Sequence, residues 1–173
     1  MELDVSELTH LDEAGQVRMV NVGDKPVTTR RAVAQGRVRI SAELVDAIRR
    51  NTLAKGNLLE VARLAGIQAA KRTDELIPLC HSLPLEHVHV EARLDPPFVH
   101  VRAQAQTTGK TGVEMEALVA VSVAALTVID MGKAIDKAMT IEGVCIVEKT
   151  GGRSGHYQLP TSETSSNQEP LTE

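Results

Sequence analysis

Two stretches in the middle of the chain alternate apolar and polar residues with the period of two that is typical of strands. Their apolar positions are Val88, Val90, Ala92, Leu94, Val99, Val101, Ala103 and Ala105. The turn signal Asp95-Pro96-Pro97 separates the two stretches. This pattern predicts a hairpin with one polar face and one apolar face, and the apolar face needs helices to cover it.

The residues before this hairpin predict a strand and two helices. Residues 33–40 alternate loosely as a strand, and Ser41 follows them as the N-cap of a short helix. Asn57 and Glu60 have the spacing of a capping box, and apolar residues then recur at helical spacing over residues 58–72.

Residues 113–138 predict a long apolar helix after the hairpin, and residues 141–148 predict a closing strand. The order strand, helices, hairpin, helix, strand predicts an α+β fold, a ferredoxin-like sandwich whose antiparallel sheet has helices packed on one face. Because the two ends are polar, we expect residues 1–18 to be an N-terminal extension, residues 19–157 a single domain and residues 158–173 a disordered tail.

Composition narrows the class of protein. The 173 residues include no Trp, one Phe and one Tyr, and the formal net charge is −4. One domain with an aliphatic core is expected at this length. Nucleic-acid binding commonly depends on aromatic side chains that stack on bases and on a net positive surface. This chain has few aromatic residues and a negative net charge, so no nucleic-acid partner is expected.

The cysteines and the longest apolar run bear on location. Cys80 and Cys145 lie far apart in apolar segments, which suits a reducing compartment, and the cytoplasm is the expected location. The apolar run over residues 117–129 is shorter than the ~20 residues that a membrane span needs. It predicts a buried helix and no membrane partner.

Residues 108–118, TGKTGVEMEAL, carry the first functional signal. A loop with two glycines and a lysine that leads into a helix offers phosphate contacts, and the carboxylates of Glu114 and Glu116 offer proton transfer. The loop is not a Walker A motif, because Gln104 stands where that motif needs a glycine. The structural alternative is that both carboxylates only complement the helix dipole.

Asp130 and Lys133 are three residues apart on the long helix, so they share a face and either act on one ligand or simply pair with each other. Glu116 lies fourteen residues before Asp130. That is nearly four turns and a separation of ~21 Å. If both carboxylates touch the same ligand, the site must be assembled from two subunits.

The segment that follows the second helix presents a histidine. Pro78 biases Ile77 to extended backbone, so His81 is expected on a rigid loop. Neighbours in an extended chain point in opposite directions, so Cys80 is expected to be a small core residue. His81 is then the candidate acid, base or ligand anchor, with a hydrogen-bonded structural histidine as the alternative.

Cations are scattered along this acidic chain, among them Arg30, Lys55, Lys71, Lys110, Lys133 and Lys149. Several of them flank glycines at turns, where backbone N–H groups and a lysine can together hold a polyphosphate. His87 and His89 share a face of one predicted strand, but no third ligand stands nearby. No metal site is therefore predicted.

Several segments taken together resemble the cyclic pyranopterin monophosphate synthases, the molybdenum cofactor biosynthesis protein C family. They are AGIQAAKRT (65–73), LIPLCH (76–81), TGKTGVEMEAL (108–118), DMGK (130–133) and KTGGRSG (149–155). The resemblance runs over residues 8–157, so it covers most of the chain.

The resemblance implies a lyase with a catalytic domain over residues 19–157. It would convert (8S)-3′,8-cyclo-7,8-dihydroguanosine 5′-triphosphate to cyclic pyranopterin monophosphate and release pyrophosphate. The resemblance also implies a homohexamer, a trimer of dimers with active sites at the dimer interface. It implies no resident cofactor, with Mg²⁺ as a companion that the triphosphate can bring.

The resemblance also assigns roles. By motif, the catalytic groups are Asp130, Lys133 and Lys55, the substrate contacts are Leu79, Cys80, His81, Met115 and Glu116, and Arg30, Lys71, Glu114 and Lys149 fall in matching positions. Asn21 and Ser82 depart from the family pattern, in which Asp and Pro are common. These departures put in doubt an acidic contact and the rigidity of the loop after His81.

Two other classes of function stay open at this point. One is a non-enzymatic nucleotide-binding regulatory module, because a fold alone does not fix a function. The other is a structural oligomer without a ligand, which would leave the turn lysines without a purpose.

Overall fold

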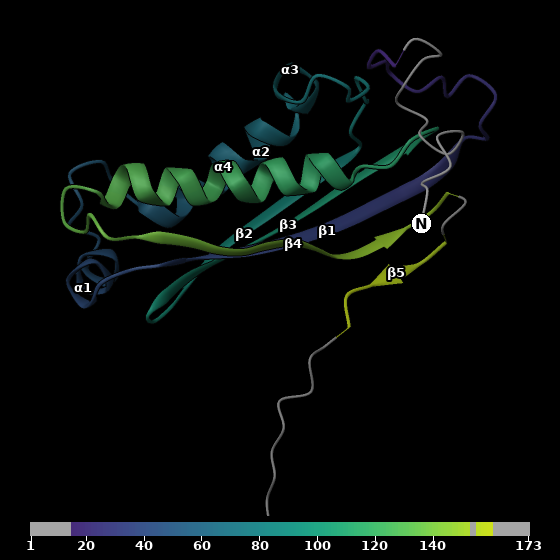
Figure 1. Cartoon of the computed structure of the whole chain (residues 1–173). Helices are drawn as coiled ribbons and strands as arrows, with labels where there is room; N and C mark the ends of the chain where they lie inside the picture. Colours follow the sequence, from purple (N-terminus) through teal and green to yellow (C-terminus); the bar gives the residue numbers. More distant parts are fainter. Residues whose placement is uncertain (1–14, 153–154, 161–173) are drawn as a thin grey trace, which may run out of the picture.

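The computed structural model describes residues 15–152 and 155–160. Their elements, in chain order, are β1 (Thr28–Arg39), α1 (Ala42–Arg50), α2 (Leu58–Ala70), α3 (Thr73–Leu76), β2 (His87–Asp95), β3 (Phe98–Gly109), α4 (Glu114–Gly132), β4 (Thr140–Thr150) and β5 (Tyr157–Gln158). The strands form one antiparallel sheet in the order β2-β3-β1-β4-β5. Helices α2 and α4 lie side by side on one face of it (Figure 1). This confirms the predicted α+β sandwich of ferredoxin-like kind.

Small residues allow the two layers to approach closely. Gly36 of β1 lies under α4, where an added Cβ would stand 2.9 Å from Cγ1 of Val121. Gly66 of α2 lies against α4, where an added Cβ would stand 2.9 Å from the carbonyl oxygen of Ala120. Because neither position has room for a side chain, α4 sits close to both the sheet and α2.

The core between the layers is aliphatic, as the composition predicts. Its fully buried side chains include Leu44, Leu58, Val33, Val38, Val90, Val99, Val101, Val113, Val121 and Val128. The alternation in β2 and β3 is confirmed, with Val90 opposite Ala103 in the register. The polar residues of these strands lie on the face that no described helix covers.

Both predicted N-caps are present. The Ser41 hydroxyl accepts a hydrogen bond from the backbone N–H of Leu44 at 3.3 Å, and the Asn57 side chain accepts one from Glu60 at 3.2 Å. The long helix ends at Gly132 instead of residue 138. The reason is tertiary, because the carboxylate of Asp136 accepts hydrogen bonds from the backbone N–H groups of Ser41 and Ala138 and holds this loop against α1.

Two short elements were not predicted, α3 and β5, because four and two residues are too few to show a periodicity. Gln158, the first residue of the predicted tail, pairs with Glu148 of β4. Most of the predicted N-terminal extension, residues 1–14, and most of the predicted tail, residues 161–173, lie outside the described residues.

Within the described part of the chain, α4 alone is long and apolar enough to cross a membrane. However, 56% of its apolar stretch is buried inside the fold. It packs on β1, β3, β4 and α2. The helix is therefore the core helix of this domain, as predicted.

Candidate functional site

Three charged side chains meet at the C-terminal end of α4. Oδ2 of Asp130 accepts a hydrogen bond from Nζ of Lys55 at 2.6 Å, and Oδ1 accepts one from Nζ of Lys133 at 2.7 Å. Nζ of Lys55 also donates to the backbone carbonyl of Asp130 at 3.0 Å. These three residues are called the Asp130 group below. They are the three for which the resemblance implies a catalytic role.

Local structure explains this arrangement. Asp130 and Lys133 share a face because they are three residues apart in the last turn of α4. Lys55 comes from the loop between α1 and α2, where Asn51 and Gly56 adopt the left-handed backbone that turns the chain. The hydrogen bond from Lys133, and then that from Lys55, lower the pKa of Asp130 to about 2. Asp130 is therefore an exposed carboxylate, ionised at neutral pH, between two ammonium groups.

A cavity of about 370 Å³ lies at the other end of α4. It is called the Glu116 cavity below. It is lined by Val20, Val22, Lys25, Leu79, Cys80, His81, Leu83, Thr111, Gly112, Glu114, Met115 and Glu116. The structure thus brings together six of the predicted substrate-binding residues from two separate motifs, LCH and VEME.

Cys80 corrects one prediction. It is half-buried and lines the Glu116 cavity together with Leu79 and His81, so it is not a core residue. The prediction failed because it assumed a flat extended chain, whereas the backbone turns here. The N–H of Cys80 donates to the carbonyl oxygen of Ile77 at 3.0 Å.

Glu116 is almost fully buried, with 4% of its surface exposed. Its pKa is raised to about 7, chiefly by burial, with smaller contributions from the negative charges of Glu114 and Asp74. Burial also raises the pKa of the Cys80 thiol, with contributions from Glu116 and Asp74. Glu116 can therefore gain or lose a proton near neutrality, while the thiol stays protonated.

His81 is held in place by the N-terminal segment. Its Nε2–H donates to the carbonyl oxygen of Val20 at 2.9 Å. Ile77 has the extended backbone that Pro78 predicts, with φ −115° and ψ 107°.

Ser82, which stands where the family often has proline, donates its hydroxyl hydrogen to the carboxylate of Asp74. A side-chain contact thus anchors the loop after His81.

Asn21, the other departure, has a local structural role. Its side-chain oxygen accepts a hydrogen bond from the backbone N–H of Gly23 at 2.8 Å. The amide therefore supports its own turn, next to the segment that lines the Glu116 cavity.

A second cavity, of about 420 Å³, lies beside the first and shares Lys25, Thr111 and Gly112 with it. It is called the Arg30 cavity below, and its lining also includes Pro26, Thr28, Arg30, Lys110 and Gly152. The guanidinium of Arg30 donates to the carbonyl oxygens of Gly109 and Lys110, at 3.1 and 3.2 Å. A cationic cavity therefore adjoins the acidic one.

Two further groups belong to this end of α4. Nζ of Lys149 lies 3.0 Å from Oε1 of Glu114 and so links β4 to the first turn of α4. Thr28, which the sequence analysis missed, has a buried hydroxyl without a hydrogen-bond partner among the described residues. A threonine at the start of a strand carries no sequence signal for such a role.

Lys71 is the C-cap of α2 and is exposed. Lys55, which binds Asp130, shortly precedes α2, so this helix begins near the C-terminal end of α4. Further along α2, Gly66 packs against Ala120 of α4. Helix α2 therefore runs antiparallel to α4, and Lys71 lies towards the Glu116 end. It is not among the residues that line the two cavities.

The predicted residues therefore form two clusters at opposite ends of one continuous helix. The Asp130 group lies at the C-terminal end of α4, and the Glu116 and Arg30 cavities lie at its N-terminal end. The helix rise puts Asp130 and Glu116 ~21 Å apart. A single chain does not bring the predicted catalytic and substrate-binding residues to one place.

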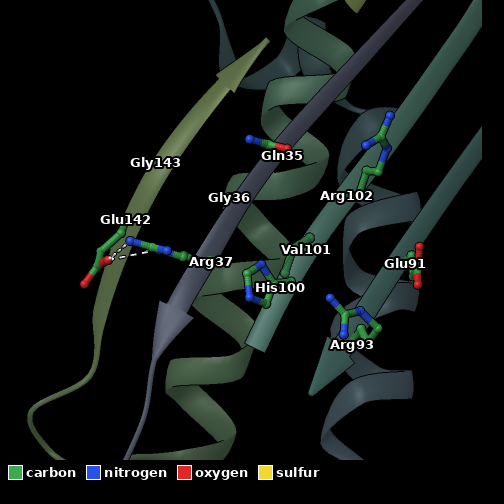
Figure 2. Close-up of a pocket in the computed structure, with 10 residues that line it drawn as sticks. All are labelled: Gln35, Gly36, Arg37, Glu91, Arg93, His100, Val101, Arg102, Glu142 and Gly143. Atoms are coloured by element: carbon green, nitrogen blue, oxygen red, sulfur yellow. Dashed lines mark hydrogen bonds and ion pairs between the residues drawn. The ribbon is translucent and has the colours of Figure 1, made fainter. Parts of the chain in front are cut away.

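A larger cavity, of about 460 Å³, lies on the uncovered face of the sheet (Figure 2). It is lined by Gln35, Gly36, Arg37, Glu91, Arg93, His100, Val101, Arg102, Glu142 and Gly143. It contains none of the predicted site residues.

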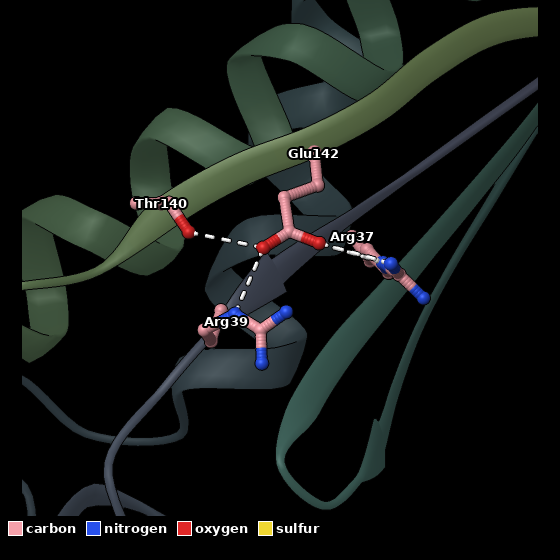
Figure 3. Close-up of polar contacts among 4 residues, drawn as sticks. All are labelled: Arg37, Arg39, Thr140 and Glu142. Carbon is pink, nitrogen blue, oxygen red and sulfur yellow. Dashed lines mark hydrogen bonds and ion pairs between the residues drawn. The ribbon is translucent and has the colours of Figure 1, made fainter.

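Charge pairing accounts for much of this face. Arg37 and Arg39 both bind the carboxylate of Glu142, which also accepts a hydrogen bond from Thr140 (Figure 3). The hydrogen bond from Arg39 is the main cause of the lowered pKa of Glu142. We therefore place the candidate site at the ends of α4 and not here, in spite of the larger volume.

In the described ranges, 15–152 and 155–160, no group of three or more His, Cys, Asp or Glu side chains could hold a metal ion. The rings of His87 and His89 stack with their centroids 6.5 Å apart. The absence of a resident metal or cofactor stays a prediction.

Comparison with known proteins gives a consistent result. The model of the MoaC family matches residues 19–152. Curated proteins named cyclic pyranopterin monophosphate synthase are similar to the chain over nearly their whole length. The one from Thermomicrobium roseum is 54% identical over 161 residues, which is 92% of this chain and 97% of the relative. The one from Roseiflexus sp. (strain RS-1) is 56% identical over 155 residues, 88% of this chain and 98% of the relative.

Proposed function

The chain belongs to the MoaC family, and from this premise we propose that it is a lyase of molybdenum cofactor biosynthesis. It converts (8S)-3′,8-cyclo-7,8-dihydroguanosine 5′-triphosphate to cyclic pyranopterin monophosphate and releases pyrophosphate. The similarity in sequence supports the reaction. The two clusters on α4 support separate roles, proton transfer at the Asp130 group and substrate binding at the two cavities.

The Asp130 group is the observation that favours an enzyme over a binding module. A phosphate-binding module needs cations, but a carboxylate that pairs with two of them would weaken phosphate binding. In proton transfer the same carboxylate is useful, because it holds both ammonium groups in place. In our proposal, Lys133 and Lys55 move protons as the five-membered purine ring opens and the pterin ring forms, and Asp130 orients them.

The Arg30 cavity is suited to the triphosphate. Arg30 and Lys110 supply positive charge, and the hydroxyl of Thr28, which has no partner within residues 15–152 and 155–160, can donate to a phosphate oxygen. Lys149 lies next to this cavity, and Lys71 lies at the same end of the helix layer. These cations would stabilise the charge that develops on the departing pyrophosphate when a ribose-derived hydroxyl attacks the phosphate.

The Glu116 cavity is suited to the ring system. Leu79, Cys80 and Met115 offer apolar and polarisable walls, and His81 offers a fixed polar group. Because the pKa of Glu116 is raised to about 7, its carboxyl can either donate or accept a hydrogen bond at the polar edge of the ring.

Both clusters can act on one substrate only if two copies of the chain contribute to one site. The ~21 Å along α4 exceeds the reach of the proton-transfer groups, which must come within hydrogen-bond distance of the reacting atoms. We therefore propose a homo-oligomer with sites between subunits, and the family resemblance suggests a homohexamer built as a trimer of dimers. We further propose a cytoplasmic enzyme without a resident cofactor, to which the triphosphate can bring Mg²⁺.

The test is incubation of the purified protein with the cyclised dihydroguanosine triphosphate, with pyrophosphate and the fluorescent oxidised pterin as readouts. We expect both products from the wild type and neither from Asp130→Asn. Asp46→Asn is the matched control, because Asp46 is an exposed carboxylate on α1. Binding of the substrate without turnover by the wild type would support the regulatory module instead.

A further inference from the structure

A half-buried carboxylate lies next to the Glu116 cavity without lining it. Asp74 belongs to α3, which packs against α4, and its carboxylate accepts a hydrogen bond from the hydroxyl of Ser82, the residue after His81. Asp74 is not among the residues that line the cavity. Any effect of Asp74 on a bound substrate must therefore pass through its neighbours.

The contact between Asp74 and Ser82 closes the loop that carries part of the cavity wall. It joins two side chains that are eight positions apart, and residues 79–81, which line the cavity, lie between them. At the start of the loop, the N–H of Ile77 donates to the carbonyl oxygen of Thr73 at 2.9 Å. The loop is thus tied to α3 at both ends, which limits the conformations that its side chains can adopt.

The charge of Asp74 differs from that of Glu114 in its partner. Glu114 pairs with the ammonium group of Lys149 at 3.0 Å. Within residues 15–152 and 155–160, Asp74 forms no ion pair, and its partner is the neutral hydroxyl of Ser82. A hydroxyl donates a hydrogen bond but brings no positive charge. The negative charge of Asp74 therefore acts on Glu116 without a paired cation to oppose it.

We propose that Asp74 is a positioning residue of the active site, which holds the loop of His81 through Ser82 and places a negative charge near Glu116. This inference rests on the proposed function, which assigns His81 and Glu116 to the ring system of the substrate. A negative neighbour favours the neutral form of a carboxyl group. Asp74 thus extends the pH range over which Glu116 can donate a hydrogen bond to the ring.

The other titratable and charged groups near the Glu116 carboxyl come from α4, the loop after α3, the segment before β1, and β4. They are Glu114, Cys80, His81, Lys25 and, through its pair with Glu114, Lys149. The two lysines are cations and oppose the effect of Asp74. Glu114 lines the cavity, whereas Asp74 does not. The charge of Asp74 can therefore be removed without a change in the cavity wall.

Urea unfolding tests the charge and needs no activity. Asp74→Asn removes the charge but keeps an oxygen that can accept the hydrogen bond from Ser82. The raised pKa of Glu116 makes the folded protein lose stability as the pH rises from 5 to 8. Asp74→Asn should make this loss smaller, because the pKa of Glu116 then lies closer to its ordinary value.

A double-mutant cycle makes this test specific. In a Glu116→Gln background, Asp74→Asn should leave the loss between pH 5 and pH 8 unchanged, because the group on which it acts no longer titrates. Glu75→Gln is the matched control, because Glu75 is the next residue of α3 and an exposed carboxylate. An equal effect of Glu75→Gln, or an effect of Asp74→Asn that persists with Glu116→Gln, would overturn the proposal.

The pH–rate profile tests the same charge in turnover. The limb of the profile that Glu116 governs should move to lower pH by about 0.3–1 unit in Asp74→Asn, and it should not move in Glu75→Gln. A profile of Asp74→Asn that coincides with that of the wild type would overturn the proposal.

Ser82 provides the test of the loop. Ser82→Ala removes the hydrogen bond but leaves the charge of Asp74 in place, so KM should rise by about 2- to 10-fold while the pH–rate profile stays in position. Ser82→Pro should restore a low KM, because the proline ring restricts the backbone without a hydroxyl. A wild-type KM for Ser82→Ala would contradict the role of the contact.

The two kinds of measurement separate the possible failures. A wild type without turnover that still shows the coupling in urea would refute the proposed function and support the link between Asp74 and Glu116. Normal turnover without the coupling, and with an unshifted profile for Asp74→Asn, would refute this inference alone.

Discussion

Nζ of Lys55 lies 2.6 Å from Oδ2 of Asp130, although the two residues are 75 positions apart in the chain. Lys133 approaches the other oxygen of the same carboxylate from within α4. One ionised carboxylate thus fixes two ammonium groups at a single point. The predictions that follow test whether this point, the buried Glu116 and the close helix packing behave as the structure indicates.

Removal of either ammonium group should stop the reaction and leave the fold intact. Lys133→Ala and Lys55→Ala should each lower kcat by about 10²- to 10⁴-fold, the range for loss of a general acid or base. Lys137→Ala is the control, because Lys137 is an exposed lysine in the loop that follows α4. Near-normal turnover by Lys133→Ala in the pterin assay would remove the Asp130 group from the mechanism.

Glu116 should make the stability of the protein depend on pH. Its pKa is about 7 in the fold against a model value of 4.5, so the folded protein binds more protons between these values than the unfolded chain does. The stability that Glu116 contributes is therefore complete below pH 4.5 and is lost as the pH rises through 7. The loss should be at most about 3 kcal/mol.

Glu116→Gln cannot titrate and should not show this loss. Urea unfolding of both proteins at pH 5 and pH 8, at one protein concentration, measures the difference. The wild type should lose more of its free energy of unfolding than Glu116→Gln between the two pH values. Parallel behaviour of the two proteins would mean that Glu116 is already ionised at pH 5.

The contact between α2 and α4 should tolerate no added methyl group at Gly66. Gly66→Ala would place a Cβ 2.9 Å from the carbonyl oxygen of Ala120, an atom of the backbone that cannot turn away. The two helices must then separate, and we expect a loss of about 1–3 kcal/mol in the free energy of unfolding. Ala65→Ser, on a less buried position of α2, is the control in the same urea titration.

The local features of the fold were predictable from the sequence, because they depend on neighbouring residues. The hairpin follows from alternation in residues 88–105, and Ser41 and Asn57 cap their helices as their residue types predict. The end of α4 was not predictable in this way. It depends on the contact of Asp136 with Ser41, which lies 95 residues away.

The site shows the same limit. Spacing in the sequence places Asp130 beside Lys133, but it does not show that Lys55 joins them. Cys80 was wrongly assigned to the core because an extended backbone was assumed where the chain turns. That the buried hydroxyl of Thr28 has no partner in the described part of the chain depends on the surroundings in the fold, so only the structure shows it.

The central claim is that one active site needs the C-terminal end of α4 from one chain and the N-terminal end of α4 from another. Co-expression of Lys133→Ala and Lys149→Ala chains with different tags tests it directly. Each variant alone should be nearly inactive, whereas random pairing of the two should restore about a quarter of wild-type turnover, because half of the pairs are mixed and each has one intact site. A mixture no more active than the two variants measured separately would contradict the claim, since it would place the complete site within a single chain.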